Sequence, residues 1–231
     1  MEKEIRAFET QINIETRADG SEDFIVEAIV YNQLSQLLGG SFREQIDPSA
    51  LDNCDMTDVV GLFNHDRNYL LGRTTAGTLT LEKHEGGLRY KMAVDKSDPD
   101  HMKVLAKIKR GDVTGSSFGF VVAPGGADWD RDMTTGTDIR TVKRIGLLDD
   151  VSLVVSPAYL QSSAGMSKRN VEALHAERDA MLQERAATIA AEPTPAELPV
   201  DAEVPAVLPT PADWQVQQQH LLLQSNRPTK N

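Results

Sequence analysis

Six of the eleven prolines in this chain of 231 residues fall between positions 193 and 211. Proline lacks a backbone N–H and has a fixed φ, so we expect this stretch to be an extended linker rather than helix or sheet. The residues after it include Trp214 and the run Leu221-Leu222-Leu223, which suit a docking peptide or, equally, a tail with incidental leucines. A folded core must therefore come from the residues before 193.

Two regions of different composition meet near residue 165. Residues 1–165 alternate short β-branched runs with turns rich in Gly and Asp, whereas residues 166–192 are rich in helix-favouring Ala, Glu, Arg, Leu and Met. The sequence therefore predicts a β-rich domain over 1–165, a helical segment over 166–192, and a Pro-rich linker with a docking tail over 193–231.

The front region contains several runs that fit short strands. They lie at 24–31, 59–63, 78–81, 88–94, 116–122, 138–142 and 151–155. One helix is predicted among them, with Asp98 as N-cap, Pro99 at its first position and Gly111 as its stop. Its apolar stripe is expected to consist of Met102, Leu105, Ala106 and Ile108. Many strands and few helices predict a mainly β (α+β) fold, with a closed or barrel-like antiparallel sheet and a few peripheral helices.

Charge and cysteine content limit the classes of function. The formal net charge of −11 disfavours a nucleic-acid partner, because a phosphate backbone would repel the chain. Cys54 is the only cysteine, which excludes an intrachain disulfide and a four-cysteine zinc site. The first residues are charged and no run of 18 apolar residues occurs, so we expect no secretory signal, no membrane partner and a reducing compartment.

Cofactor chemistry has no support in the sequence. It contains no HExxH pair, no GxxxxGK[ST] loop and no GxGxxG turn, so neither a metal nor a nucleotide cofactor is expected. Acid–base and nucleophilic chemistry remain, and three segments could supply the residues for it.

The first of these segments is Asn64-His65-Asp66, which follows the apolar run 59–63. A histidine at the end of a buried strand can be held by the strand backbone and still reach a cleft. The alternative interpretation is a histidine in a surface turn, capped by Asp66.

The second segment is Gly115-Ser116-Ser117-Phe118-Gly119-Phe120. Strand alternation places Ser117 on the face opposite Phe118 and Phe120, and the glycines would leave space for another backbone, such as a substrate strand. The spacing is not the GxSxG turn of the α/β-hydrolases. An ordinary Ser/Gly bulge is the alternative.

The third segment begins with Asp149 and Asp150, directly before the apolar run 151–155. An acid at the start of a buried strand is unusual unless a partner lies beside it. A carboxylate that accepts a hydrogen bond from histidine Nδ1–H fixes the tautomer and stabilises the imidazolium. Asp149 is the adjacent candidate for this role, but alternation places it on the opposite face, where we expect it to be solvent-exposed. An ordinary turn acid is the alternative for both residues.

Together with two further segments, these resemble the prohead maturation proteases of tailed bacteriophages, a family distantly similar to the herpesvirus assemblins. The segments, in family order, are Ser41–Ala50, which resembles F-x-E-x-I-x-P-x-A; Leu62–Asp66 with Leu71–Arg73, the histidine motif; Glu85–Leu88, a hairpin; Ser117–Phe120, S-x-G-F; and Asp150–Ala158, E-V-S-L-V-x-x-P-A. The resemblance spans residues 20–165. Because five segments occur in order, we prefer it to the structural alternatives given above.

The resemblance implies a serine endopeptidase that needs no cofactor and works inside the assembling prohead, in the host cytoplasm. Its substrates would be the scaffold and the major capsid protein with its scaffold-like extension, and commonly the enzyme itself. It implies Ser117 as nucleophile, His65 as general base and Asp150 as the residue that orients His65. Residues 1–165 would form the mature protease, and a weak homodimer would be consistent with the assemblin relatives. The small residues at 162–165, at the domain edge, suggest self-cleavage there.

One departure and two rival functions follow from the same residues. The family has glutamate where this chain has Asp150, so backbone placement must bring the shorter carboxylate to His65. Backbone N–H groups near Ser117 or near Arg144-Ile145, and Arg144 itself, are candidate oxyanion donors. The rivals are a non-enzymatic capsid scaffolding or interaction protein that retains the fold, and a serine hydrolase that acts on esters.

Overall fold

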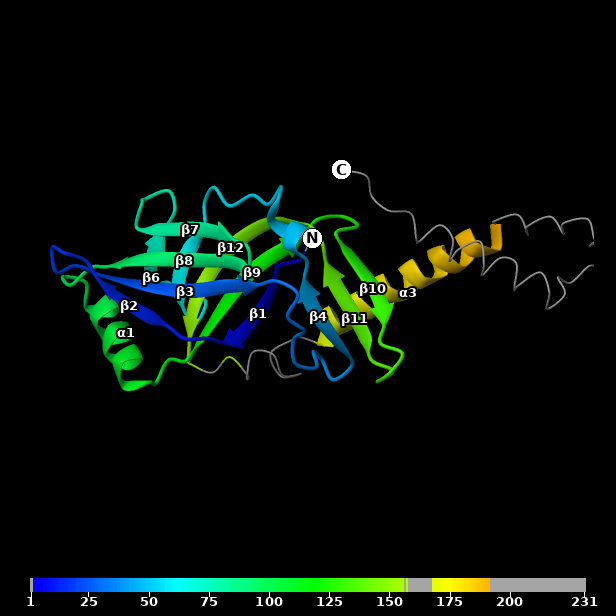
Figure 1. Ribbon diagram of the computed structural model, residues 1–231, viewed down its shortest axis with the longest axis horizontal. Coiled ribbons are helices and arrows are strands. Elements are labelled where there is room, and N and C mark those ends of the chain that lie inside the picture. Colours follow the sequence, from blue (N-terminus) through cyan, green and yellow to red (C-terminus); the bar gives the residue numbers. More distant parts are fainter. Residues whose placement is uncertain (1, 156, 158–167, 192–231) are drawn as a thin grey trace, which may run out of the picture. The chain divides into compact units, whose positions relative to one another are not determined.

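The computed structural model describes residues 2–155, 157 and 168–191, and its elements are mainly β-strands with few helices (Figure 1). The strands are β1 (Glu4–Glu9), β2 (Asn13–Thr16), β3 (Glu22–Val30), β4 (Phe42–Ile46), β5 (Val60–Phe63), β6 (Asp66–Arg73), β7 (Leu79–His84), β8 (Gly87–Val94), β9 (Gly115–Val122), β10 (Ala127–Arg131), β11 (Asp138–Val142) and β12 (Ile145–Val154). The helical elements are the 3₁₀ turn η1 (Pro48–Leu51), α1 (Pro99–Arg110) and α3 (Lys168–Ala191).

The strands form three sheets. A five-stranded sheet has the order β1-β9-β12-β5-β6, a four-stranded sheet β2-β3-β8-β7, and a three-stranded sheet β10-β11-β4. The pairs β12–β5 and β11–β4 are parallel, so the expectation of an antiparallel arrangement throughout is wrong. Within the described ranges no sheet closes on itself, because β1 and β6 are edge strands, and the expected barrel is not confirmed.

The main core contains side chains from both larger sheets. Phe24 of β3 and Tyr90 of β8 belong to one buried cluster with Phe118 of β9 and Val151 of β12. All four are nearly inaccessible to solvent. Burial of such apolar surface is the main term that stabilises the fold, and here it holds β9 and β12 rigidly at the centre of their sheet.

Helix α1 begins and ends where its caps predict. The Asp98 side chain accepts a backbone N–H, Pro99 takes the first helical position, and Gly111 ends the helix with φ 81°. Met102 and Ala106, expected in the apolar stripe, are exposed instead. The buried face consists of His101, Val104, Leu105 and Ile108.

Helix α3 packs on a second, smaller core beside the three-stranded sheet. Leu38, Phe42, Trp129 and Leu174 are buried together, with Val171 and Met181 against them. The described helix as far as residue 189 thus belongs to the same compact unit as the strands. The Pro-rich linker, the docking tail and the junction at 162–165 lie outside the described residues.

The N-terminal strand β1 was not expected from the sequence, and it is the neighbour of β9 in the central sheet. Its six residues, EIRAFE, mix charged and apolar side chains without the β-branched enrichment that identified the other strands. In the described ranges, no helix combines the length and apolar character needed to span a membrane.

Candidate active site

Ser117 lies near the start of β9, in the interior of the five-stranded sheet. It is paired with Ala7 of β1 on one side and with Ser152 of β12 on the other. Its neighbours Phe118 and Phe120 point into the main core, as alternation predicts. Ser117 itself is fully buried, so its hydroxyl depends on partners within the protein.

His65 is presented by a tight turn between β5 and β6. Only Asn64 and His65 separate the two strands, and both have positive φ, 53° and 58°. Two such residues are what a type I′ hairpin requires; asparagine accepts that conformation readily, whereas histidine adopts it at a cost. Asn64 fixes the turn to β12, because its N–H donates to the Leu153 carbonyl at 2.9 Å and its Oδ1 accepts the Val155 N–H at 3.1 Å. The strained turn is therefore fixed to the end of the strand that carries Asp150, which is the neighbour of β5 in the sheet.

The structure brings Ser117, His65 and Asp150 into one hydrogen-bonded chain. His65 Nε2 lies 2.5 Å from Ser117 Oγ, and His65 Nδ1 lies 2.5 Å from Asp150 Oδ1. With Asp150 ionised, Nδ1 carries the hydrogen and donates it to the carboxylate, which leaves the Nε2 lone pair to accept the serine hydroxyl. This is the arrangement of a Ser-His-Asp triad. Asp66 does not bond to His65; its carboxylate accepts from Asn68.

The carboxylate of Asp150 has a partner on each oxygen. Oδ1 also accepts a hydrogen bond from Ser152 Oγ at 3.0 Å, and Oδ2 lies 2.5 Å from Lys3 Nζ. Burial raises the pKa of Asp150, but the hydrogen bonds and charges of His65 and Lys3 outweigh it and leave this pKa below its ordinary value. The site thus holds an ionised carboxylate at neutral pH.

Asp149 does not contact His65, and its placement corrects the expectation of a solvent-exposed acid. The pairing of β12 with β9 is irregular between Leu148 and Asp150, which marks a β-bulge at Asp149. The carboxylate of Asp149 is partly buried and lies 2.5 Å from Lys3 Nζ and 2.9 Å from Arg67. Both acidic side chains therefore converge on one ammonium group, because the bulge interrupts strand alternation.

The glycines of the serine segment accommodate protein side chains rather than an incoming strand. A Cβ atom at Gly119 would lie 2.3 Å from Asp150 Oδ2 and 2.3 Å from Lys3 Cε. A Cβ atom at Gly115 would lie 2.5 Å from Pro157 Cγ. The expectation that these positions leave room for a substrate backbone is wrong. The spacing of Ser117 and Gly119 instead lets the carboxylate and the lysine cross β9 beside the nucleophile.

The Ser117 hydroxyl has a second partner, the backbone carbonyl of Arg6 on β1, at 2.9 Å. A hydroxyl has only one hydrogen, so it donates either to His65 or to this carbonyl. When the imidazole is neutral, His65 can take the hydrogen. When the imidazole is protonated, Nε2–H donates to Oγ, and Oγ in turn donates to the Arg6 carbonyl.

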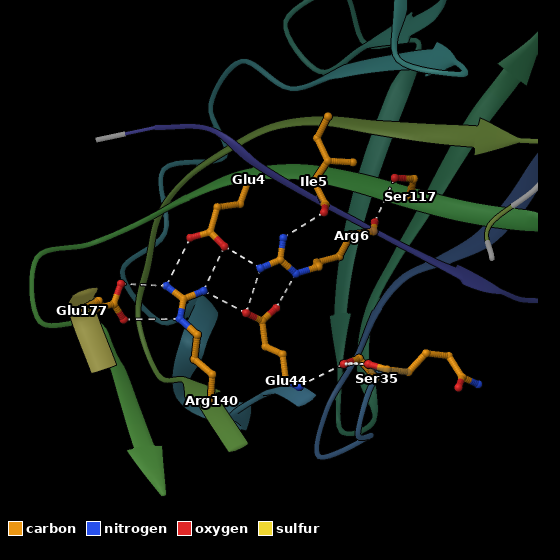
Figure 2. A network of polar contacts seen from close by, with 9 residues as sticks. Glu4, Ile5, Arg6, Ser35, Glu44, Ser117, Arg140 and Glu177 are labelled. Carbon is orange, nitrogen blue, oxygen red and sulfur yellow. Dashed lines mark hydrogen bonds and ion pairs between the residues drawn. The ribbon is translucent and has the colours of Figure 1, made fainter. Parts of the chain in front are cut away.

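A buried ion-pair network fixes the strand that carries this carbonyl (Figure 2). The Arg6 guanidinium binds Glu44 of β4 at 2.7 Å and Glu4 at 2.6 Å. Arg140 of β11 binds the same two carboxylates, at 2.8 and 2.9 Å, and Glu177 of α3 at 3.3 Å. Burial raises the pKa of Glu44, but the two guanidinium groups outweigh it and lower this pKa overall. β1 is therefore anchored from the side opposite the triad.

Three neighbours of the triad were missed by sequence reasoning, and one suggested residue is displaced. Lys3 and the Arg6 carbonyl had no signal because β1 itself was not expected, whereas Ser152 could have been found as the second residue after Asp150 on the same strand face. Arg144 donates to the carbonyls of Pro124 and Gly125, in the turn beyond the far end of β9. It is therefore not placed to stabilise an oxyanion at the nucleophile.

No set of three His, Cys, Asp or Glu side chains in the described ranges could hold a metal ion. Three of the other histidines have hydrogen-bond partners outside the triad: His84 with Glu27, His101 with the backbone N–H of Asp95, and His175 with Ser41. His220 lies outside the described residues.

Comparison with known proteins gives one family match and a distant structural likeness. The sequence profile of a family described as caudovirus prohead serine protease matches residues 11–177. A solved structure of the bacteriophage T4 capsid assembly protease, gp21, aligns with a TM-score of 0.42 and 10% identity over 67% of this chain and 98% of its own length. No curated protein sequence matches this chain.

Proposed function

Because the chain belongs to the family of caudovirus prohead serine proteases, we propose that it is a serine endopeptidase of prohead maturation. Its substrates are the scaffold protein, or the scaffold-like extension of the major capsid protein, and the enzyme itself. The observation that carries the proposal is the chain of two 2.5 Å hydrogen bonds through Ser117, His65 and Asp150.

In this mechanism Ser117 Oγ attacks the scissile carbonyl while His65 Nε2 takes the hydroxyl hydrogen. The same nitrogen then delivers that proton to the leaving amine, and water repeats the sequence on the acyl-enzyme. Asp150 holds the ring with Nδ1–H toward its carboxylate and stabilises the imidazolium that forms. No step requires a metal or an organic cofactor.

Access to the nucleophile requires movement of the groups that cover it. Ser117 is inaccessible to solvent, and the His65 side chain is 11% exposed. Substrate binding must therefore open the structure above Ser117 before Oγ can reach a carbonyl. We expect small active-serine probes such as fluorophosphonates to label Ser117 slowly.

The proposal is tested by incubating the purified protein with the capsid and scaffold proteins of the same phage. We expect cleavage by the wild type and by Ser116→Ala, a matched control whose hydroxyl faces the core. Ser117→Ala should lose activity by a factor of the order of 10⁴ or more. Folded wild type that cleaves neither protein would overturn the proposal and favour the non-enzymatic scaffolding function. Turnover of small esters alone would favour a different serine hydrolase.

Self-cleavage near residues 162–165 is proposed from the small residues Ser162-Ser163-Ala164-Gly165 at the predicted domain edge. Residues 1–165 would then be the mature protease, and the segments 166–192 and 193–231 would place it among scaffold and capsid subunits. Intact-mass spectrometry should show wild type shortening by the mass of the tail while Ser117→Ala stays full length. Equal stability of the two proteins would contradict self-cleavage.

Three finer points complete the proposal. The protein acts inside the assembling prohead in the host cytoplasm and has no nucleic-acid or membrane partner. It forms a weak homodimer, which sedimentation at rising protein concentration would detect. The distant similarity to the herpesvirus assemblins stays a prediction, and it is the basis for the dimer.

A further inference from the structure

Among the described residues, Lys3 is the one group outside the triad that binds the side of Asp150 facing away from His65. Its Nζ lies 2.5 Å from Asp150 Oδ2 and 2.5 Å from Asp149 Oδ2. Burial lowers the pKa of this ammonium group, but its hydrogen bonds to the two carboxylates outweigh that effect and raise it overall. The group is therefore a permanent cation at neutral pH.

Asp150 Oδ2 has Lys3 as its only hydrogen-bond partner among the described residues. Oδ1 is shared by His65 and Ser152, and the side chain of Asp150 is completely buried. Without Lys3 a charged oxygen would remain buried and unsatisfied, which costs more than an ordinary lost hydrogen bond. The carboxylate would then gain by rotating or by taking up a proton.

The path of Lys3 to Asp150 depends on the absence of a side chain at Gly119, where a Cβ would lie 2.3 Å from Lys3 Cε. The lysine is also held from its outer side, because Asp149 is bound in turn by Arg67. Lys3 is therefore placed by β9 and by the bulge of β12, and its side chain remains 35% exposed.

We propose that Lys3 is a positioning residue of the triad, which holds the Asp150 carboxylate in the orientation that presents Oδ1 to His65. This inference rests on the proposed protease function. Lys3 does not touch the reacting atoms and acts only through Asp150. Its positive charge also opposes protonation of the carboxylate. The loss of activity on removing Lys3 should therefore be larger at low pH than at high pH.

The groups that face Asp150 come from several elements, and all bear on its titration. They are Lys3 before β1, His65 in the β5–β6 turn, Asp149 and Ser152 on β12, Tyr90 on β8 and, through Asp149, Arg67 on β6. Of these, Lys3 is the cation in direct contact with Oδ2. Its removal should therefore have a larger effect on Asp150 than removal of Arg67.

The first test is the pH profile of peptide cleavage by the full chain. We expect Lys3→Met to move the acidic limb of kcat/KM up by about one pH unit, which is about a tenfold loss on that limb. The loss should lie in kcat rather than KM, and Lys3→Arg should restore the wild-type profile. Lys91→Met is the matched control, since Lys91 also bridges two carboxylates, Glu15 and Asp23, far from the triad along the chain.

Lys3→Gln separates orientation from charge, because glutamine can donate a hydrogen bond without a positive charge. The positioning role predicts that Lys3→Gln retains more activity than Lys3→Met at high pH but shares its displaced acidic limb. If the acidic limbs of Lys3→Met and Lys3→Gln lie at the same pH as that of wild type, the proposal is overturned. Far-UV circular dichroism identifies a variant that has not folded, and the remaining variants then decide.

A second readout needs no activity. The ¹³C resonance of the Asp150 carboxyl, assigned by its loss in Asp150→Asn, should titrate at higher pH in Lys3→Met than in wild type. An unchanged titration would overturn the role of Lys3 even in an active enzyme. Absence of cleavage by wild type, with the displaced titration present, would instead reject the protease function and leave the contact established.

Discussion

Two buried polar clusters lie on opposite faces of the N-terminal strand, and both keep carboxylates ionised away from water. On one face Glu4 and Arg6 join the network with Glu44, Arg140 and Glu177. On the other face Lys3 and the Arg6 carbonyl reach the Ser117–His65–Asp150 chain. The two clusters differ in how completely their charges are matched.

In the network, Glu44 is bound by two guanidinium groups that cannot lose their protons at any ordinary pH. In the triad, Asp150 faces one ammonium group, that of Lys3, and the imidazole of His65. The same solution to a buried charge thus gives a fixed anchor in one place and, in the proposed mechanism, a proton carrier in the other. The two clusters differ because Glu44 is bound by two arginines, whereas one of the two basic partners of Asp150 is a histidine. That histidine also contacts the Ser117 hydroxyl.

The largest effect that separates the two clusters should come from Asp150→Asn. The amide can donate to His65 Nδ1 and favour the wrong tautomer, so we expect kcat to fall by about 10⁴. Steady-state cleavage of a capsid-derived peptide measures this. Glu44→Gln, assayed at a temperature where it is folded, should retain activity per folded molecule. Equal losses in the two variants would erase the distinction between anchor and proton carrier.

Stability should respond in the reverse order. Glu44→Gln leaves two buried guanidinium groups short of a carboxylate, so we expect it to lower the free energy of unfolding by about 3–5 kcal/mol. Urea unfolding followed by circular dichroism measures the change. Glu177→Gln is the matched control from the same network, because that carboxylate is 39% exposed and should contribute less than about 1 kcal/mol.

The smallest effect should be the pH dependence of stability. The pKa values of Asp150 and Glu44 are lowered in the folded protein, so their ionisation stabilises the fold above the pKa of the unfolded chain, about 4. This stabilisation is lost as the pH falls from that value toward the lowered ones. Lys3→Met should lose about 1–2 kcal/mol less across that window than wild type does. Unfolding free energies that fall equally in both proteins would show that Lys3 does not influence Asp150.

Local sequence patterns were sufficient to predict those strands and helices whose own residues favour the structure that they adopt. Strand β3 is a run of β-branched residues, and α1 has a capping aspartate, a first-turn proline and a terminal glycine. Ser117, His65 and Asp150 were identified by the order of family-like segments, since residues 65, 117 and 150 share no local pattern that would place them together.

The features that were missed depend on partners far away in the chain. Arg6 of strand β1 is buried because Glu44 of β4 binds its guanidinium, and Arg140 of β11 binds the same carboxylate. No pattern in the residues around Arg6 predicts these distant partners. Asp149 was assigned to the wrong environment because a bulge shifts the strand register only once β9 and β12 are paired. The expected barrel is not confirmed because the number of strands in a sequence does not show which of them become sheet edges.

The packing of α3 bears on what a cut in the preceding segment would do. Leu174 of the helix is buried against Phe42 and Trp129. Three polar contacts also hold the helix: Glu177 with Arg140, Arg178 with Asp138, and His175 with Ser41. Scission anywhere between residues 157 and 168 would break a peptide bond and none of these contacts. The two products would therefore stay associated after the cut, and release of the C-terminal piece would require these contacts to break in a separate step.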